Sequence, residues 1–397
     1  VTVTATNTLA RGNVSVLKVD ENGTPLAGVH FVLKDSAGNV VNEGDTDGSG
    51  ALSFTGLLLG DYTVQETATL PGYVLDATVY PASVTENGQT VTVSATNILA
   101  RGNISVLKTD ETGAPLAGVH FVLKDNGGNV IGEGDTDGSG ALSFTGLVLG
   151  DYTVQETATQ PAYVLDTTVY PVSVTENGQT VTITATNIFA RGDVSILKTN
   201  AESDEALPGV HFVLKDSAGS VIAEGDTGAD GKLSFTGLLL GSYVLQETAT
   251  VEGYVLDGEE IPVTVSENGQ TVEITRQNTP IRGNLEIIKK DAYEETYLMG
   301  AGFRLYDSDG NQIEEAYTDA FGKLTFHDLL YGSYTYQEFK APKGFELDDT
   351  IYPFSITEHG VTITHTRGNL RRPGTIQVKK QNPDGSPLAG AAFLLEY

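Results

Sequence analysis

Five lysines stand at the same place in a repeated stretch of alternating apolar and polar residues. In its first copy, GNVSVLKVD, the side chains of Val14, Val16 and Lys18 share one face of a strand, because side chains alternate between the two faces of a strand. An apolar row that ends on an amine predicts a charged group at the edge of a core. The five lysines lie 90, 90, 91 and 91 residues apart: Lys18, Lys108, Lys198, Lys289 and Lys380.

Two further apolar rows of the first repeat also end on polar groups. In YTVQETA the row of Tyr62 and Val64 ends on Glu66, and in TVTVSATN the row that contains Ala95 ends on Asn97. An unpaired buried charge is costly, so we expect the amine, the carboxyl group and the carboxamide to lie together. Burial also disfavours charge, which lowers the pKa of a lysine and makes it a nucleophile, and raises the pKa of a glutamate and makes it a proton donor.

The same three residue types return at matching offsets in the later repeats. The sets are Lys18, Glu66 and Asn97; Lys108, Glu156 and Asn187; Lys198, Glu247 and Asn278; and Lys289, Glu338 and Asn369. Two plainer interpretations remain open at this point. The lysine and glutamate form a buried ion pair with the asparagine as a hydrogen-bond partner, or the strand register is different and Lys18 points into water.

The elements that must position these side chains are short strands. Runs rich in Val, Thr, Leu and Tyr are separated by turn sequences such as ENGT, SAGN and DTDGSG, and no stretch has the period and length of a helix. About seven strands per repeat predict an all-β fold, a tandem array of immunoglobulin-like or prealbumin-like β-sandwich domains. The predicted units are residues 1–10 (the last strand of a preceding domain), 11–100, 101–190, 191–281, 282–372 and 373–397 (the start of a fifth domain), so the chain is expected to be an excerpt of a longer array.

The composition excludes several classes of partner. With 52 acidic and 23 basic residues the net charge is −29, which argues against nucleic acid or an anionic membrane as a partner. The chain has no cysteine, so disulfides cannot stabilise these small domains. The sequence predicts no cofactor and no metal site, because the DTDGSG turns lack the further acidic positions of a calcium loop and the histidines occur singly.

The combination of a first-strand lysine in VLKVD or VLKTD, a glutamate in YTVQETATLPGY or YTYQEFKAPKGF, and a last-strand ATN resembles the Cna-B domains of Gram-positive surface adhesins and pilins. The resemblance covers four units and both fragments. It implies a spontaneous isopeptide bond between the lysine and the asparagine of each set, assisted by Glu66, Glu156, Glu247 or Glu338. In this chemistry a protonated Glu66 would donate a hydrogen bond to the carboxamide oxygen of Asn97 while Lys18 attacks the carbon and ammonia leaves.

The fourth unit leaves two interpretations of its asparagine. Counting from the neighbouring lysines places Asn369 in the set, whereas aligning ITHT with the family's usual asparagine-threonine ending places His365 there. The count favours Asn369. In the two terminal fragments Asn7 lacks a lysine within this chain, and Lys380 lacks both partners.

The predicted function is a structural stalk or spacer of a bacterial adhesin, located outside the cell at the cell wall of a Gram-positive bacterium. The bond forms once per domain, so the chain is not expected to be an enzyme with turnover. We expect a monomeric rod with no membrane insertion in this segment, and a host-surface or matrix ligand bound by other domains of the parent protein. The alternative is that the repeats themselves bind such a ligand.

Overall fold

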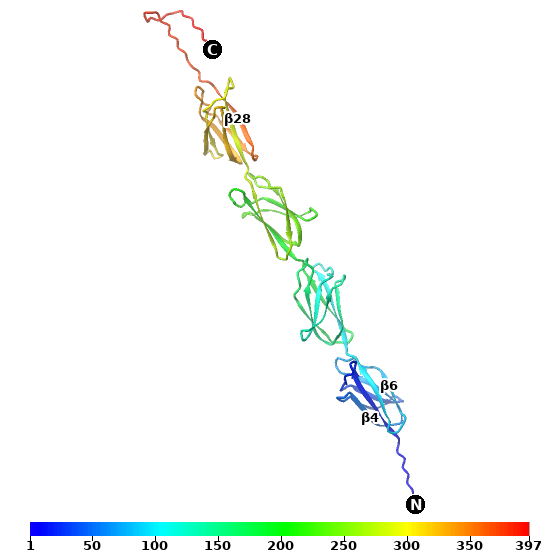
Figure 1. Ribbon diagram of the computed structural model, residues 1–397. Helices are drawn as coiled ribbons and strands as arrows, with labels where there is room; N and C mark the ends of the chain where they lie inside the picture. The colour runs from blue at the N-terminus through cyan, green and yellow to red at the C-terminus, as the bar shows by residue number, and fades with distance from the viewer. Residues whose placement is uncertain (397) are drawn as a thin grey trace. The chain divides into compact units, whose positions relative to one another are not determined.

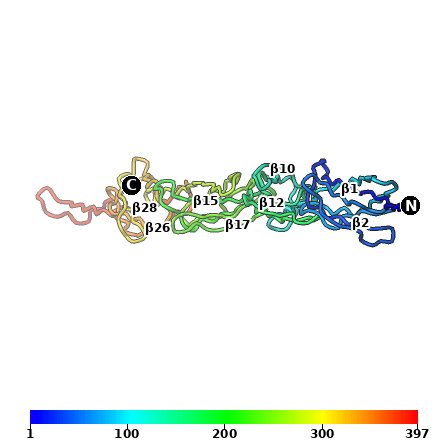
Figure 2. Tube along the Cα trace, turned by 90° about the horizontal axis from the view of Figure 1, so that it is seen from below, coloured from blue at the N-terminus to red at the C-terminus, as the bar shows by residue number. Residues whose placement is uncertain are grey.

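The computed structural model describes residues 1–396, and every regular element in that range is a strand. The described residues fall into two compact units, Val1–Ala190 and a second unit that begins at Arg191. Each unit contains two β-sandwiches of seven strands (Figure 1), and the path of the chain through each sandwich can be followed in the tube trace of Figure 2. The predicted all-β array is therefore confirmed.

The first unit carries the first and second sandwiches. The strands of the first are β1 (Arg11–Asp20), β2 (His30–Asp35), β3 (Val40–Asp45), β4 (Ala51–Leu58), β5 (Gly60–Ala68), β6 (Val79–Val84) and β7 (Thr90–Asn97). Those of the second are β8 (Arg101–Asp110), β9 (His120–Asp125), β10 (Val130–Asp135), β11 (Ala141–Val148), β12 (Gly150–Ala158), β13 (Val169–Val174) and β14 (Thr180–Asn187).

The second unit carries the third and fourth sandwiches. The strands of the third are β15 (Arg191–Asn200), β16 (His211–Lys215), β17 (Val221–Asp226), β18 (Lys232–Leu239), β19 (Gly241–Ala249), β20 (Glu260–Val265) and β21 (Thr271–Asn278). Those of the fourth are β22 (Arg282–Asp291), β23 (Gly302–Tyr306), β24 (Gln312–Tyr317), β25 (Lys323–Leu330), β26 (Gly332–Lys340), β27 (Ile351–Ile356) and β28 (Thr362–Asn369).

All four sandwiches share one topology. In the first, a three-stranded sheet has the order β4-β1-β7 and a four-stranded sheet has the order β3-β2-β5-β6. The first and last strands, β1 and β7, are parallel neighbours, with Lys18 opposite Ala95 and Asp20 opposite Asn97. This pairing brings the first-strand lysine and the last-strand asparagine onto adjacent strands although they are 79 residues apart in the chain.

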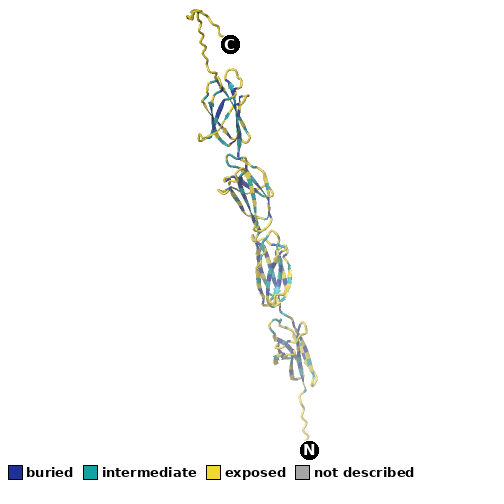
Figure 3. Ribbon diagram, turned by 60° about the vertical axis from the view of Figure 1, so that its left-hand side comes forward, coloured by how far each residue is buried: buried dark blue, intermediate teal, exposed yellow. Residues whose placement is uncertain are grey.

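The core of each sandwich lies between its two sheets. In the first, the rows predicted from the sequence do face inward: Val14 and Val16 on β1 and Val64 on β5 are fully buried, together with Phe31 on β2. Figure 3 shows buried residues along the strands and exposed residues in the connecting loops. The inward-facing rows on β1, β5 and β7 therefore place Lys18, Glu66 and Asn97 in the same interior, as the alternation of side chains along the strands predicted.

The two ends of the described chain contain no strand. Residues 1–10 and 372–396 lie outside the four sandwiches, and Asn7 and Lys380 are both exposed. Within residues 1–396, neither side chain contacts a set of partners like those inside the sandwiches.

Candidate functional site

A cluster of three polar side chains is buried in the first sandwich. Lys18, Glu66 and Asn97 are each at most 1% exposed. The Nζ atom of Lys18 lies 2.7 Å from Oε2 of Glu66 and donates a hydrogen bond to Oδ1 of Asn97 at 2.5 Å. The amide nitrogen of Asn97 in turn donates to Oε1 of Glu66 at 2.8 Å. Each of the three groups therefore touches the other two, and we call this arrangement the triad.

Local backbone geometry places the glutamate. On the four-stranded sheet Phe31 pairs with Glu66, but the preceding residue of β2, His30, pairs with Ala68, so Thr67 is an extra residue that bulges from β5. A bulge re-aims the strand end, and such irregularities recur next to functional groups. The ring of Phe31 lies below the lysine amine, with its centroid 5.8 Å from Nζ. An aromatic ring therefore covers one side of the lysine amine.

The triad recurs in full in the second sandwich, and the third has the same arrangement without the hydrogen bond from the lysine to the asparagine oxygen among the described residues. Lys108 Nζ lies 2.6 Å from Glu156 and donates to Asn187 Oδ1 at 2.7 Å, and Asn187 donates to Glu156 at 2.7 Å. In the third, Lys198 Nζ lies 2.7 Å from Glu247 Oε2, and Asn278 donates to Glu247 at 2.6 Å. All six side chains are at most 2% exposed.

The fourth sandwich holds the same three residue types with looser contacts. Lys289 Nζ lies 3.4 Å from Glu338 Oε2, and Asn369 donates to Glu338 Oε1 at 2.9 Å. Among the described residues no hydrogen bond reaches Lys289 Nζ or Asn369 Oδ1. Burial lowers the pKa of Lys289, although the charge of Glu338 acts in the opposite direction. The structure brings Asn369 to Glu338, which also faces Lys289, whereas His365 lies against the hydroxyl of Tyr336 at 2.9 Å.

The contact made by the glutamate differs from the one expected from the sequence. We expected the carboxyl group of Glu66 to face the carboxamide oxygen of Asn97, but it faces the amide nitrogen, while the oxygen faces Lys18. A second acceptor for that nitrogen, the hydroxyl of Thr69 at 2.5 Å, supports this orientation. With two acceptors on one side and a cationic donor on the other, the carboxamide has one favourable orientation.

Sequence reasoning missed two features of the site. One is the threonine three residues after the glutamate, which the repeated text ETAT carries in the first three sandwiches and which the fourth replaces by Ala341. The other is Asp76, whose carboxylate accepts a hydrogen bond from Tyr80 at 2.5 Å. Burial, together with that bond, raises the pKa of Tyr80 to about 12. Burial also acts to raise the pKa of Asp76, but hydrogen bonds from Thr78 and Tyr80, and to a smaller extent the charge of Lys18, lower it overall. The recurring spacing D-x-x-x-Y was the available signal.

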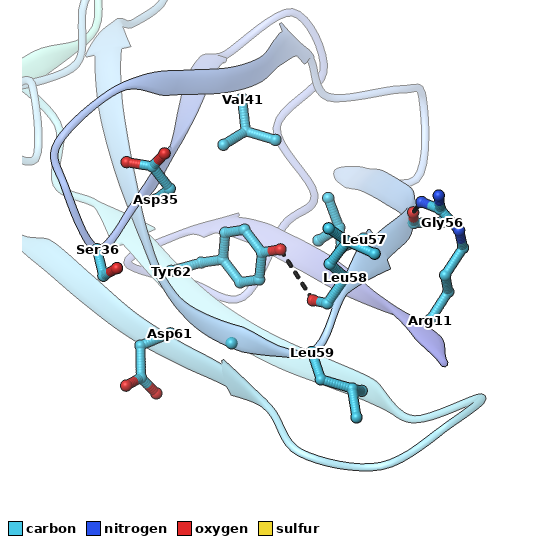
Figure 4. Close-up of a pocket in the computed structure, with 11 residues that line it drawn as sticks. Arg11, Asp35, Ser36, Val41, Gly56, Leu57, Leu58, Leu59, Asp61 and Tyr62 are labelled. Carbon is cyan, nitrogen blue, oxygen red and sulfur yellow. Dashed lines mark hydrogen bonds between the residues drawn. The ribbon is translucent and has the colours of Figure 1, made fainter. Parts of the chain in front are cut away.

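A surface hollow of the first sandwich is separate from the triad. It is lined by residues such as Arg11, Val41 and Leu57, and the hydroxyl of Tyr62 donates to the carbonyl of Leu58 across it (Figure 4). None of the triad residues lines it. Within residues 1–396, no three His, Asp or Glu side chains gather in a way that suits a metal ion, and no helix there is long and apolar enough to cross a membrane.

Known proteins resemble this chain over most of its length. The family model described as the SpaA prealbumin-like fold domain matches residues 12–98, 102–188, 192–280 and 283–370. Serine-aspartate repeat-containing protein F of Staphylococcus epidermidis is 28% identical over 395 residues, which cover 82% of this chain and 22% of that protein. Colossin-A of Dictyostelium discoideum is 26% identical over 387 residues, covering 83% of this chain and 3% of that protein.

A solved structure shares the fold. The Bacillus anthracis TIE protein aligns with a TM-score of 0.66 at 22% sequence identity, covering 87% of this chain and 69% of that chain. At this identity the likeness concerns the fold alone. This chain spans about a fifth of the staphylococcal relative and a much smaller part of Colossin-A.

Proposed function

This chain belongs to the SpaA family of prealbumin-like fold domains, and from that premise we propose that it is a stalk segment of a bacterial surface adhesin whose sandwiches are each locked by a Lys–Asn isopeptide bond. The bonds are Lys18 to Asn97, Lys108 to Asn187, Lys198 to Asn278 and Lys289 to Asn369. One observation carries the proposal. A lysine, a glutamate and an asparagine on three separate strands meet inside every sandwich and are almost completely shielded from water.

The triad geometry supports a condensation that needs no outside reagent. Transfer of a proton from the ammonium of Lys18 to Oε2 of Glu66, 2.7 Å away, leaves a neutral amine, which a buried site favours. The amine attacks the Asn97 carbon, and the bond from that carbon to the amide nitrogen breaks. The attacking nitrogen gives up a second proton, which passes through the Glu66 carboxyl group to the departing nitrogen, 2.8 Å from Oε1. The products are an amide that keeps one lysine hydrogen, a protonated glutamate and ammonia.

Folding supplies most of what the reaction needs. Holding the amine and the carboxamide in contact turns a reaction between two molecules into one within a single chain, which can be worth roughly 7 to 11 kcal/mol of the barrier. The glutamate adds proton transfer on both sides of the carbon. Because the product stays in the core, each sandwich reacts once. The chain is a structural protein and not an enzyme with turnover.

The cross-link explains how cysteine-free domains of this size serve in a stalk. It ties β1 to β7, the strands by which the chain enters and leaves the first sandwich, so a pulling force passes through a covalent bond instead of separating the sheet. Closing a loop of about eighty residues could stabilise the sandwich by roughly 4 to 5 kcal/mol in the chain-entropy estimate used for disulfides. A spacer requires this kind of toughness, and near-identical repeats supply length.

The relatives support an extracellular location at the surface of a Gram-positive bacterium, since serine-aspartate repeat-containing protein F comes from Staphylococcus epidermidis. We assign any host or matrix ligand to other parts of the parent protein. The strong negative charge of this segment fits a solvated spacer that does not bind nucleic acid.

Intact mass spectrometry of the folded chain tests the proposal, because each bond removes one ammonia. We expect a deficit of four ammonia molecules in the mature chain. Succinimide formation at Asn–Gly pairs also releases ammonia, so peptide mapping must find the branched peptide that joins the Lys18 segment to the Asn97 segment. A mass equal to that of the unmodified chain would rule out the bonds.

A further inference from the structure

We propose that Thr69, Thr159 and Thr250 are positioning residues for the condensation, because each holds the departing amide nitrogen of its asparagine. The fourth sandwich has Ala341 at this place, and its bond forms more slowly. The inference rests on the proposed isopeptide chemistry and adds a residue that sets its rate.

The threonine contact is the same in three sandwiches. Asn97 Nδ2 donates to Thr69 Oγ1 at 2.5 Å, Asn187 Nδ2 donates to Thr159 Oγ1 at 2.8 Å, and Asn278 Nδ2 donates to Thr250 Oγ1 at 2.7 Å. Each threonine stands three residues after the triad glutamate, just beyond the end of its strand, and is half-buried. It therefore contacts the triad from beyond the end of the strand.

The contact adds a second acceptor that holds the amide nitrogen on the side of the carboxyl group. An amide nitrogen has two hydrogens, and here one points to the glutamate and the other to the threonine. The oxygen is thereby turned towards the lysine. The proton relay requires this orientation, because the carboxyl group can protonate the departing nitrogen only if that nitrogen lies within hydrogen-bond reach. A carboxamide turned by half a rotation would present its oxygen to Glu66 and leave the nitrogen without a proton donor.

The fourth sandwich lacks this second acceptor. Asn369 Nδ2 donates to Glu338, and the methyl group of Ala341 offers no oxygen. The third sandwich separates two effects, because it keeps the threonine contact although no hydrogen bond joins Lys198 to Asn278 Oδ1 among the described residues. The amide nitrogen faces the glutamate in both the third and the fourth sandwich, so what the fourth lacks is the second acceptor that holds this nitrogen in place.

The experiment follows bond formation during synthesis of the full chain. Cell-free translation is sampled over time, each sample is quenched in denaturant, and the branched peptide of each sandwich is quantified by mass spectrometry. Thr69→Ala should slow the first sandwich about three- to tenfold, the factor expected from losing one neutral hydrogen bond in the transition state. Thr69→Ser should restore the rate, and Thr69→Val should not. Ala341→Thr should accelerate the fourth sandwich by a similar factor.

Two controls separate positioning from stability. Thr63→Ala removes an outward-facing, half-exposed threonine of the same strand and should leave the rate unchanged. In a Lys18→Ala background, where no bond can form, Thr69→Ala should barely shift the thermal unfolding of the first sandwich. A large shift there would mean that the threonine acts through folding, and would overturn the assignment.

The outcomes for the two proposals are distinct. If the wild-type chain forms branched peptides and the Thr69→Ala variant forms the branched peptide of its first sandwich at the wild-type rate, the threonine is not a positioning residue. The isopeptide proposal then still stands. If Ala341→Thr leaves the fourth sandwich unchanged, the hydroxyl does not set the rate, and the inference fails again. If no wild-type sandwich forms a branched peptide at any time, the isopeptide proposal itself fails.

Discussion

The first and fourth sandwiches place the same triad in very different surroundings. In the first, the rows that lead to Glu66 and Asn97 are aliphatic, with Val64 two residues before the glutamate and Val93 four residues before the asparagine, both buried. In the fourth, the corresponding residues are Tyr336, which is fully buried, and His365. Lysine, glutamate and asparagine nevertheless meet in both.

The substitutions in the fourth sandwich form a cluster of their own. Arg367 stacks on Tyr352 with its guanidinium carbon 3.9 Å from the ring centroid, and Tyr352 donates to Asp348 at 2.7 Å. The backbone amide of Asp348 donates to Glu338 at 3.0 Å. A chain of polar contacts thus runs from this cluster to the triad. The comparison teaches that strand register and the β-bulge place the triad, while the packing around it is free to change.

The largest expected effect tests whether both sandwiches use the same chemistry. Glu66→Gln and Glu338→Gln keep the size of the side chain but remove the group that accepts and delivers protons. Each change should slow bond formation in its own sandwich by at least about 100-fold, the contribution typical of general acid–base catalysis. The branched peptide of each sandwich is the readout.

Matched controls use exposed glutamates of the same sandwiches, Glu43→Gln and Glu314→Gln, which should leave both rates unchanged. A fourth sandwich that still reacts at the wild-type rate in the Glu338→Gln variant would break the comparison, because its bond would then depend on another proton carrier.

The next largest effect concerns stability. Lys18→Met and Lys289→Met replace the amine by an apolar chain of similar length and prevent the cross-link. Because both bonds close loops of nearly equal length, each variant should lose about 4 to 5 kcal/mol of unfolding free energy in its own sandwich, whatever the surrounding core. Calorimetry of the full chain measures this, with Lys34→Met as a control at a half-exposed lysine. A much smaller loss in one of the two would show that its bond is absent or incomplete in the mature chain.

Much of this arrangement could be predicted from the strand alternation. The parity of three rows placed Lys18, Glu66 and Asn97 in one interior, and counting residues placed Asn369 rather than His365 beside the fourth lysine. The orientation of the carboxamide could not be predicted, because alternation does not show which end of an inward-facing amide meets the glutamate, and the supporting hydroxyl of Thr69 reaches the site from beyond the strand end. The polar cluster of the fourth sandwich was also hidden, since alternation marks inward positions without showing which inward side chains bond to one another.

The smallest expected effect is a pH dependence confined to the fourth sandwich. Tyr336 and Arg367 both face Nδ1 of His365, at 2.9 and 3.3 Å. Arginine can only donate, so Nδ1 must act as an acceptor and the imidazole is held neutral. Burial, and secondarily the charge of Arg367, lower the pKa of His365 below its ordinary value of 6.5.

The sign of the effect follows from proton binding. As the pH falls below 6.5, the ordinary pKa of histidine, His365 takes up a proton in the unfolded chain before it does so in the folded sandwich. The contribution of His365 to stability is therefore complete above that pH and is lost on acidification. Because His365 is partly exposed, solvent screening limits the loss to on the order of 1 kcal/mol or less. Calorimetry between about pH 7 and pH 5 should show the fourth sandwich losing stability faster than the first, which has Val93 at this position. His365→Val should remove this difference in stability loss between the two sandwiches. A pH dependence that persists in this variant would come from other titrating groups, and the two cores would then respond alike to acid.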